Sequence, residues 1–86
     1  MSEEMLDKAK ERGYTVVAQS GDKTWYSLMD ETRPVNLQLF IDTNQFELTH
    51  MIGMLTLTTG KCGSFMNDEH FKRIEKKINR VVLDLL

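Results

Sequence analysis

The residues of this chain that could do chemistry gather in one stretch, residues 47–65 (ELTHMIGMLTLTTGKCGSF). It contains the single cysteine, Cys62, and one of the two histidines, His50, and its TGKC is similar to part of a phosphate-binding loop. Such a loop needs G-x-x-x-x-G-K-[ST] between a strand and a helix that begins at the lysine. Here six residues separate Gly53 from Gly60, and Cys62 stands where the Mg²⁺-binding hydroxyl belongs. Residues 60–63 are therefore predicted to form a turn, not a nucleotide site.

Cysteine catalysis needs a thiolate and a base within reach. Neither His50 nor His70 stands at a spacing typical of a Cys–His pair, and Cys62, Asp68, Glu69 and His70 match no metal-ligand spacing. We therefore expect no catalytic residue, no metal site and no cofactor, and we expect that the protein is not an enzyme.

The basic face of the predicted last helix is a second candidate site. Lys72, Lys76 and Arg80 form one i, i+4 row, with Arg73 and Lys77 beside it, opposite an apolar stripe. Nearby acids are predicted to balance part of this charge, Asp68 and Glu69 next to Lys72 and Arg73, and Asp84 next to Arg80. Three interpretations stay open: a solvated helix face, a nucleic-acid contact, and docking on an acidic protein surface.

The elements that position these residues follow from the periodicity of apolar residues. Helices are predicted at about 2–12, ending at Gly13, and at about 67–85, capped by Asn67. Strands are predicted at about 14–19, 24–29, 35–42 and 46–58. Every connection is too short for a parallel crossover, so the strands should form an antiparallel four-stranded meander. The fold class is then α+β, a two-layer sandwich in α-β-β-β-β-α order over a single domain, residues 1–86.

The fourth predicted strand has apolar residues on both faces. Phe46 and Leu48 share one parity, and the later group Met51, Leu55 and Leu57 shares the other. A bulge near residues 49–50 would keep both groups on one face.

Ile52 and Met54 then lie on the opposite face, together with Phe40 and one of the two alternating sets Trp25/Met29 or Tyr26/Leu28. Two helices can hardly bury both faces of the sheet. Either they divide between the faces, or an apolar patch stays open. Open apolar patches mark partner surfaces. We predict that Trp25, Phe40, Ile52 and Met54 form such a patch.

Composition sets the remaining limits. The 86 residues carry 11 basic and 13 acidic side chains, a net charge of −2, which is typical neither of a DNA mimic nor of a protein that coats nucleic acid. One cysteine fits a reducing compartment. The charged N-terminus has no secretory h-region, and no apolar run is long enough to span a bilayer. We expect a cytoplasmic protein that contacts no membrane.

The order of elements also resembles a known family. A first helix ending at Gly13 and Tyr14, a meander and a closing helix are similar to the type III secretion chaperone-like fold. The resemblance covers the order of elements and carries no site residue over. It implies a dimeric module that holds a peptide or a protein.

These observations predict a small protein that binds another protein and acts by occupying a surface on it, with a possible homodimer. Compact, motif-poor proteins of this size are common among phage and mobile-element products that block a host protein, such as a defence nuclease, in the host cytoplasm. The alternatives are a nucleic-acid binder that uses the basic helix and the dimeric chaperone-like module.

Overall fold

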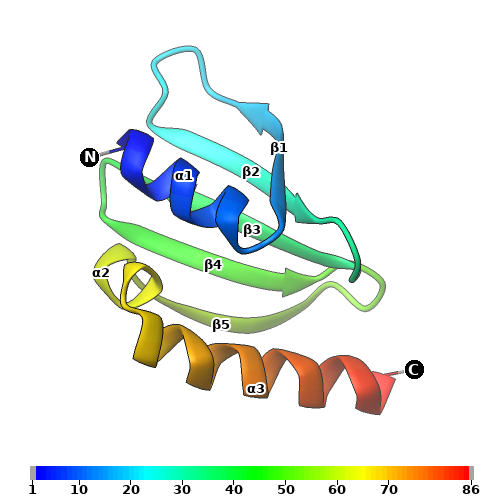
Figure 1. The fold of residues 1–86 in the computed structure, drawn as a ribbon. Helices are drawn as coiled ribbons and strands as arrows, with labels where there is room; N and C mark the ends of the chain where they lie inside the picture. Colours follow the sequence, from blue (N-terminus) through cyan, green and yellow to red (C-terminus); the bar gives the residue numbers. More distant parts are fainter. Residues whose placement is uncertain (1, 86) are drawn as a thin grey trace.

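The computed structural model describes residues 2–85 and has an α+β architecture (Figure 1). Its elements are α1 (Ser2–Glu11), β1 (Tyr14–Gln19), β2 (Trp25–Asp30), β3 (Val35–Phe40), β4 (Gln45–His50), β5 (Leu55–Lys61), α2 (Cys62–Met66) and α3 (Asp68–Leu85). The five strands form one antiparallel sheet in the order β1-β2-β3-β4-β5. The predicted α+β class and the antiparallel meander are confirmed, whereas the strand count of four is wrong.

The ends of the two long helices are those that the sequence predicts. Gly13 has a φ of +93°, the left-handed conformation that glycine adopts readily after a helix, and its N–H donates to the carbonyl of Lys10 at 3.0 Å. The side chain of Asn67 accepts the N–H of His70 at 3.1 Å, as a helix N-cap does. Local capping therefore fixes both points where a helix meets the rest of the fold.

The error in the strand count lies in residues 46–58. The chain does not continue as one bulged strand there but reverses at residues 51–54, so that β4 and β5 pair with each other. This reversal, not a bulge near Thr49 and His50, is the cause of the slip in apolar parity. A register shift does occur, but in β5, where Leu57 is the extra residue between the partners of Leu48 and Thr49.

The predicted turn at residues 60–63 is also wrong. β5 continues to Lys61, and the short helix α2 begins at Cys62. Gly60 is needed for a different reason from a turn, because a Cβ at this position would lie 3.0 Å from Cε1 of Phe46 on β4. The missing side chain of Gly60 makes room for the Phe46 ring in the core.

The hydrophobic core lies on one face of the sheet. Alternate residues of the central strands point into it, among them Tyr26, Leu28, Leu37, Leu39 and Leu48. The helices cover the same face and contribute Met5 and Ala9 from α1, Cys62 and Phe65 from α2, and Phe71, Ile78 and Val82 from α3. Figure 1 shows α1 lying across the central strands and α3 running beside β5. Of the two predicted arrangements, the fold therefore adopts the one that leaves a sheet face open.

Candidate interaction surface

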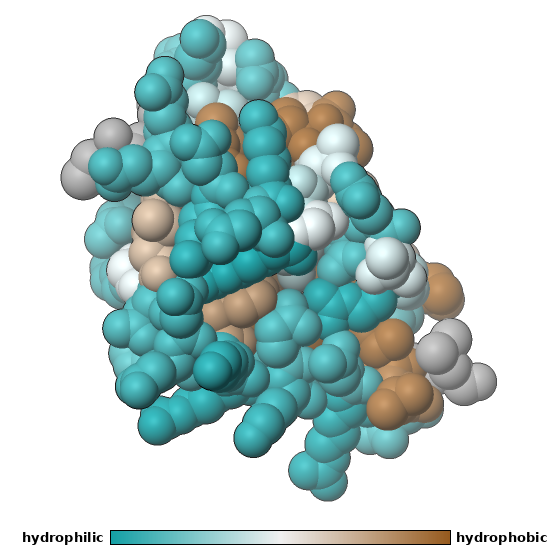
Figure 2. Space-filling model, viewed as in Figure 1, coloured by the Kyte–Doolittle hydropathy of each residue, from teal (hydrophilic) through white to brown (hydrophobic). Residues whose placement is uncertain are grey.

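The β4–β5 turn is the most exposed apolar segment of the described chain. Three residues of the turn and Leu55, the first residue of β5, are large and hydrophobic, and their exposed fractions are 38% for Met51, 75% for Ile52, 70% for Met54 and 47% for Leu55. Figure 2 shows apolar atoms at this end of the molecule, where α3 also ends, on a face that is otherwise mostly hydrophilic. Hairpin turns are usually built from Gly, Asn, Asp and Ser, so this composition is unusual.

The backbone of the turn is held at two points. The N–H of Met51 donates to the carbonyl of Pro34 at 2.8 Å, and the N–H of Gly53 donates to Nδ1 of His50 at 3.4 Å. Met54 has a φ of +50°, a left-handed conformation that disfavours residues with a Cβ. The turn therefore keeps a methionine where a glycine would fold more easily.

The open face of the sheet carries two aromatic residues. Trp25 on β2 and Phe40 on β3 are direct cross-strand partners, and both are half-buried. Trp25 Nε1 donates to Oε1 of Gln38 at 3.1 Å, which fixes the indole against the sheet. A depression of about 350 Å³ runs from Trp25 toward the methionines of the β4–β5 turn. Its lining consists of Trp25, Ser27, Asn36, Gln38, Glu47, Thr49, Met51, Met54 and Thr56.

The floor of this depression is polar. Asn36 Nδ2 donates to Ser27 Oγ at 2.8 Å and to the carbonyl of Leu28 at 2.9 Å, while Thr49 Oγ1 donates to Glu47 Oε1 at 3.2 Å. These bonds order the side chains between the aromatic residues and the turn. The open face is therefore not one continuous apolar patch.

The structure places the four predicted patch residues as follows. Trp25 and Phe40 lie side by side at one end of the open face, and Met54 lines the far end of the depression. Ile52 lies in the turn and does not line this depression. Ile52 and Met54 are exposed and Trp25 and Phe40 are half-buried. The prediction placed Ile52 and Met54 in a strand, because the turn lacks the usual turn residues.

The basic face of α3 is exposed over its whole length. Lys72, Arg73, Lys76, Lys77 and Arg80 are all exposed, and none of the ion pairs within residues 2–85 includes them. The predicted pairing with Asp68 does not form. This carboxylate binds α1 instead, with Oδ1 at 2.8 Å from Lys8 Nζ and 2.9 Å from Arg12 Nη2. Hydrogen bonds from Lys8 and Arg12 lower the pKa of Asp68.

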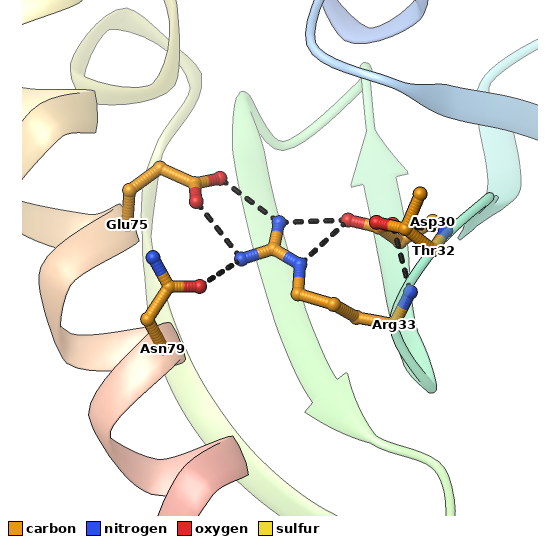
Figure 3. Close-up of polar contacts among 5 residues, drawn as sticks. All are labelled: Asp30, Thr32, Arg33, Glu75 and Asn79. Atoms are coloured by element: carbon orange, nitrogen blue, oxygen red, sulfur yellow. Dashed lines mark hydrogen bonds and ion pairs between the residues drawn. The ribbon is translucent and has the colours of Figure 1, made fainter.

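Arg33, in the β2–β3 loop, forms the main polar link between the sheet and α3 (Figure 3). Its guanidinium donates to Asp30 Oδ2 at 2.7 and 3.0 Å, to the Glu75 carboxylate at 2.9 and 3.1 Å, and to Asn79 Oδ1 at 2.6 Å. No motif in the sequence predicts this network, because Glu75 and Asn79 are far from Arg33 in the chain.

The network shifts the pKa values of its members. Burial raises the pKa of Asp30, but hydrogen bonds from Thr32 and Arg33 and the charge of Arg33 bring it below its ordinary value. Burial lowers the pKa of Arg33, whereas the bonds to Glu75 and Asp30 raise it by more. Both side chains are therefore charged at neutral pH, and Arg33 links Asp30 to Glu75 and Asn79 on α3.

The potentially reactive side chains lie inside the protein or apart from one another. Cys62 is buried, and its burial raises the pKa of the thiol, which disfavours the thiolate that cysteine chemistry needs. Burial also raises the pKa of Tyr14. His50 is 1% exposed, whereas His70 is exposed on α3. Within residues 2–85, no three His, Cys, Asp or Glu side chains gather closely enough to hold a metal ion.

No helix in the described part of the chain is both long enough and apolar enough to cross a membrane. Comparison of the chain with protein-family models, with curated proteins and with solved structures finds no match.

Proposed function

We propose that this protein binds another protein and that the β4–β5 turn is the centre of the contact. One observation carries the proposal: four large apolar side chains, Met51, Ile52 and Met54 in the turn and Leu55 at the start of β5, stand exposed next to one another in the chain. They contribute little to the core, and Met54 holds a backbone conformation unfavourable for its type. A partner with an apolar pocket would bury them.

The energetics favour such a contact. Transfer of an exposed Ile or Met side chain from water into an apolar pocket contributes about 2 kcal/mol. Methionine also adapts its shape to a partner, because its side chain is unbranched and flexible. Trp25 and Phe40 lie on the open face that continues from the turn, and they could extend the contact.

Site-specific photocrosslinking in the native cell tests this proposal. A photoreactive amino acid at position 52 should form a covalent complex with one partner, whereas the same group at position 17 should not. Val17 is a matched control because it is 58% exposed and apolar but lies on the edge strand β1. Equal crosslinking of one partner from both positions, or none from position 52, would contradict the proposal.

The mode of action that we propose is occupation of a partner's surface, without catalysis. An inhibitor encoded by a phage or a mobile element, which blocks a host protein such as a defence nuclease in the cytoplasm, would act in this way. A homodimer formed through the same turn is the alternative within this class. Sedimentation equilibrium of the purified protein and of Ile52→Glu distinguishes the two, because only a homodimer would dissociate on this substitution.

A nucleic-acid binder is the second candidate function. It is favoured by the five exposed basic residues of α3 (Lys72, Arg73, Lys76, Lys77 and Arg80), which form no ion pair within residues 2–85. Binding through this face should weaken steeply with salt, since phosphate contacts release counterions. Fluorescence anisotropy with single- and double-stranded DNA and RNA at low salt tests it. The triple variant Lys72→Glu, Lys76→Glu and Arg80→Glu should abolish the signal, and no binding by the wild type would exclude this function.

A further inference from the structure

His50 lies where the hydrophobic core meets the β4–β5 turn. It is the last residue of β4, it is 1% exposed, and it lies on the helix-covered face of the sheet. Its cross-strand partners are Val35 on β3 and Leu55 on β5. A polar ring in such a position is unusual, because an apolar side chain would fill the same space without desolvating any nitrogen.

The two ring nitrogens have different surroundings. Nδ1 accepts the N–H of Gly53, at the tip of the turn, at 3.4 Å. Nε2 is buried and has no hydrogen-bond partner in the described structure. A neutral imidazole that accepts at Nδ1 carries its hydrogen at Nε2. The neutral ring therefore gives up one hydrogen bond in order to make the bond to the turn.

We propose that neutral His50 positions the β4–β5 turn through its bond to Gly53, and that protonation of the ring releases the turn. The imidazolium ion carries N–H groups at both nitrogens, so Nδ1 can no longer accept and would face the Gly53 N–H with a second donor. A buried positive charge without a partner is also unfavourable. Opening of the turn removes both penalties, because it exposes the ring to water.

The cross-strand partners of His50 are apolar. Val35 and Leu55, on the two adjacent strands, do not titrate. The buried residues in the C-terminal half of α3, Ile78 and Val82, are apolar. None of the ion pairs within residues 2–85 includes His50.

The charged groups at this end of the helix-covered face are already paired with one another. Asp30, at the end of β2, binds Arg33, and Arg33 binds Glu75 on the flank of α3. Tyr14 is the cross-strand partner of Asp30, and its raised pKa keeps its hydroxyl neutral. The cluster has two carboxylates and one guanidinium, but none of its members forms an ion pair with His50 within residues 2–85.

Hydrogen exchange at the Gly53 amide, measured by NMR on the free protein, tests the inference. Exchange is measured from about pH 8 downward for as long as the protein stays folded. After division by the intrinsic rate at each pH, protection of the Gly53 amide should fall at least about tenfold from the neutral to the protonated state of the ring. His50→Gln retains an acceptor that does not titrate, so its protection should be independent of pH. His70→Gln, at the exposed histidine, should behave as the wild type.

A second readout in the wild type keeps the test valid if His50→Gln does not fold. The Gly53 amide shift should follow the same titration curve as the ring nitrogens of His50, and not the curve of His70. Protection of Gly53 that does not change with pH, or that changes equally in His50→Gln, would overturn the inference.

The consequence for binding depends on the proposed function, but the exchange experiment does not, since it uses the free protein. If Ile52→Glu left binding unchanged, the proposed function would fail and the role of His50 would stand. If Gly53 protection were independent of pH, the role of His50 would fail and the proposed function would stand.

Discussion

Arg33 forms the main polar link between the sheet and α3. It is the single polar residue of the β2–β3 loop that contacts both the end of β2, at Asp30, and α3, at Glu75 and Asn79. The side chain of Asp30 is 4% exposed, and the guanidinium of Arg33 is the cation that pairs with its carboxylate, beside hydrogen bonds from Thr32. A guanidinium suits this position because its planar set of N–H groups can donate to two carboxylates at once.

Replacement of Arg33 should therefore destabilise the protein. Arg33→Met keeps the aliphatic stem but leaves the carboxylate of Asp30 buried without a cation, and we expect a loss of about 3 kcal/mol. Urea unfolding measures this loss directly. Lys72→Met is the matched control, because Lys72 is exposed and should change stability by less than about 0.5 kcal/mol. Equal effects of the two substitutions would show that the network does not stabilise the fold.

The lowered pKa of Asp30 predicts a dependence of stability on pH. A carboxylate whose pKa is lower in the folded state stabilises the fold above its unfolded pKa of about 3.9, and this contribution is lost as the pH falls through the folded value. The difference in unfolding free energy between the wild type and Asp30→Asn should be constant from neutral pH to about pH 5 and should shrink below about pH 4. A difference that grows on acidification contradicts this assignment.

Cys62 should react only when the protein unfolds. It is 2% exposed, and burial raises the pKa of its thiol. We expect an aromatic disulfide reagent at pH 8 to label the native protein at a rate that follows unfolding, and to label the urea-unfolded protein at once. Rapid labelling of the native protein would show that the thiol is accessible and reactive.

At the level of elements, the β4–β5 turn is built mostly from residues that disfavour turns, and these residues are exposed. The other positive-φ residues outside glycine are Lys23 and Asn44, in the β1–β2 and β3–β4 connections. Asn tolerates the left-handed conformation well, because its short polar side chain can hydrogen-bond locally, whereas Met has no such compensation. Met54 is therefore unfavourable for folding at this position, and this supports its proposed role in binding a partner.

Met54→Gly separates these two roles. The substitution removes the conformational penalty and little packing, so the free energy of unfolding should rise by about 1 kcal/mol while partner binding weakens. Chemical denaturation and a binding assay measure the two effects. Asn44→Gly should give a smaller gain in stability and leave binding unchanged. A large loss of stability in Met54→Gly would show instead that the side chain belongs to the core.

Gly60 tests the packing of β5 against β4. A methyl group at this position would meet the Phe46 ring at 3.0 Å, so Gly60→Ala should destabilise the protein by about 1–3 kcal/mol. Gly63 is the control, because an added Cβ there meets nothing within 4 Å and alanine favours a helix. Thermal unfolding compares the two variants, and equal melting temperatures would contradict the predicted clash.

The sequence predicted most elements because their signals are local. The strands at 14–19 and about 35–42, the glycine at the end of α1 and the cap of α3 depend on residues near one another in the chain. The β4–β5 turn was missed because MIGM, apart from Gly53, contains no residue typical of a turn. The Arg33 network was not predicted because Glu75 and Asn79 lie more than forty positions from Arg33 in the chain.

The placement of the candidate site shows the same division. The sequence predicted that Ile52 and Met54 would lie outside the core, and both are exposed in the structure. It did not indicate that they occupy a turn while Trp25 and Phe40 occupy the opposite end of the open face, because that arrangement depends on strand pairing. Spacing within the last helix likewise could not predict that Asp68 pairs with Lys8 and Arg12, because both lie on α1.

At the level of the whole molecule, the core and the proposed binding surface occupy different parts of the fold. All three helices pack on one face of the sheet and form the core with it. The other face, with its polar floor, and the β4–β5 turn at its end remain available. Substitutions at the exposed side chains of the turn should therefore leave the fold intact, so their effect on the proposed binding can be measured separately.

The most direct test compares the affinities of two matched variants for the crosslinked partner. Ile52→Glu should fold as the wild type does, since Ile52 is 75% exposed, and should raise the Kd at least about 100-fold because it places a charge in an apolar pocket. Val17→Glu should leave the Kd within about twofold of the wild type. Titration calorimetry with circular dichroism as the folding control measures both. An unchanged Kd for folded Ile52→Glu would contradict the account.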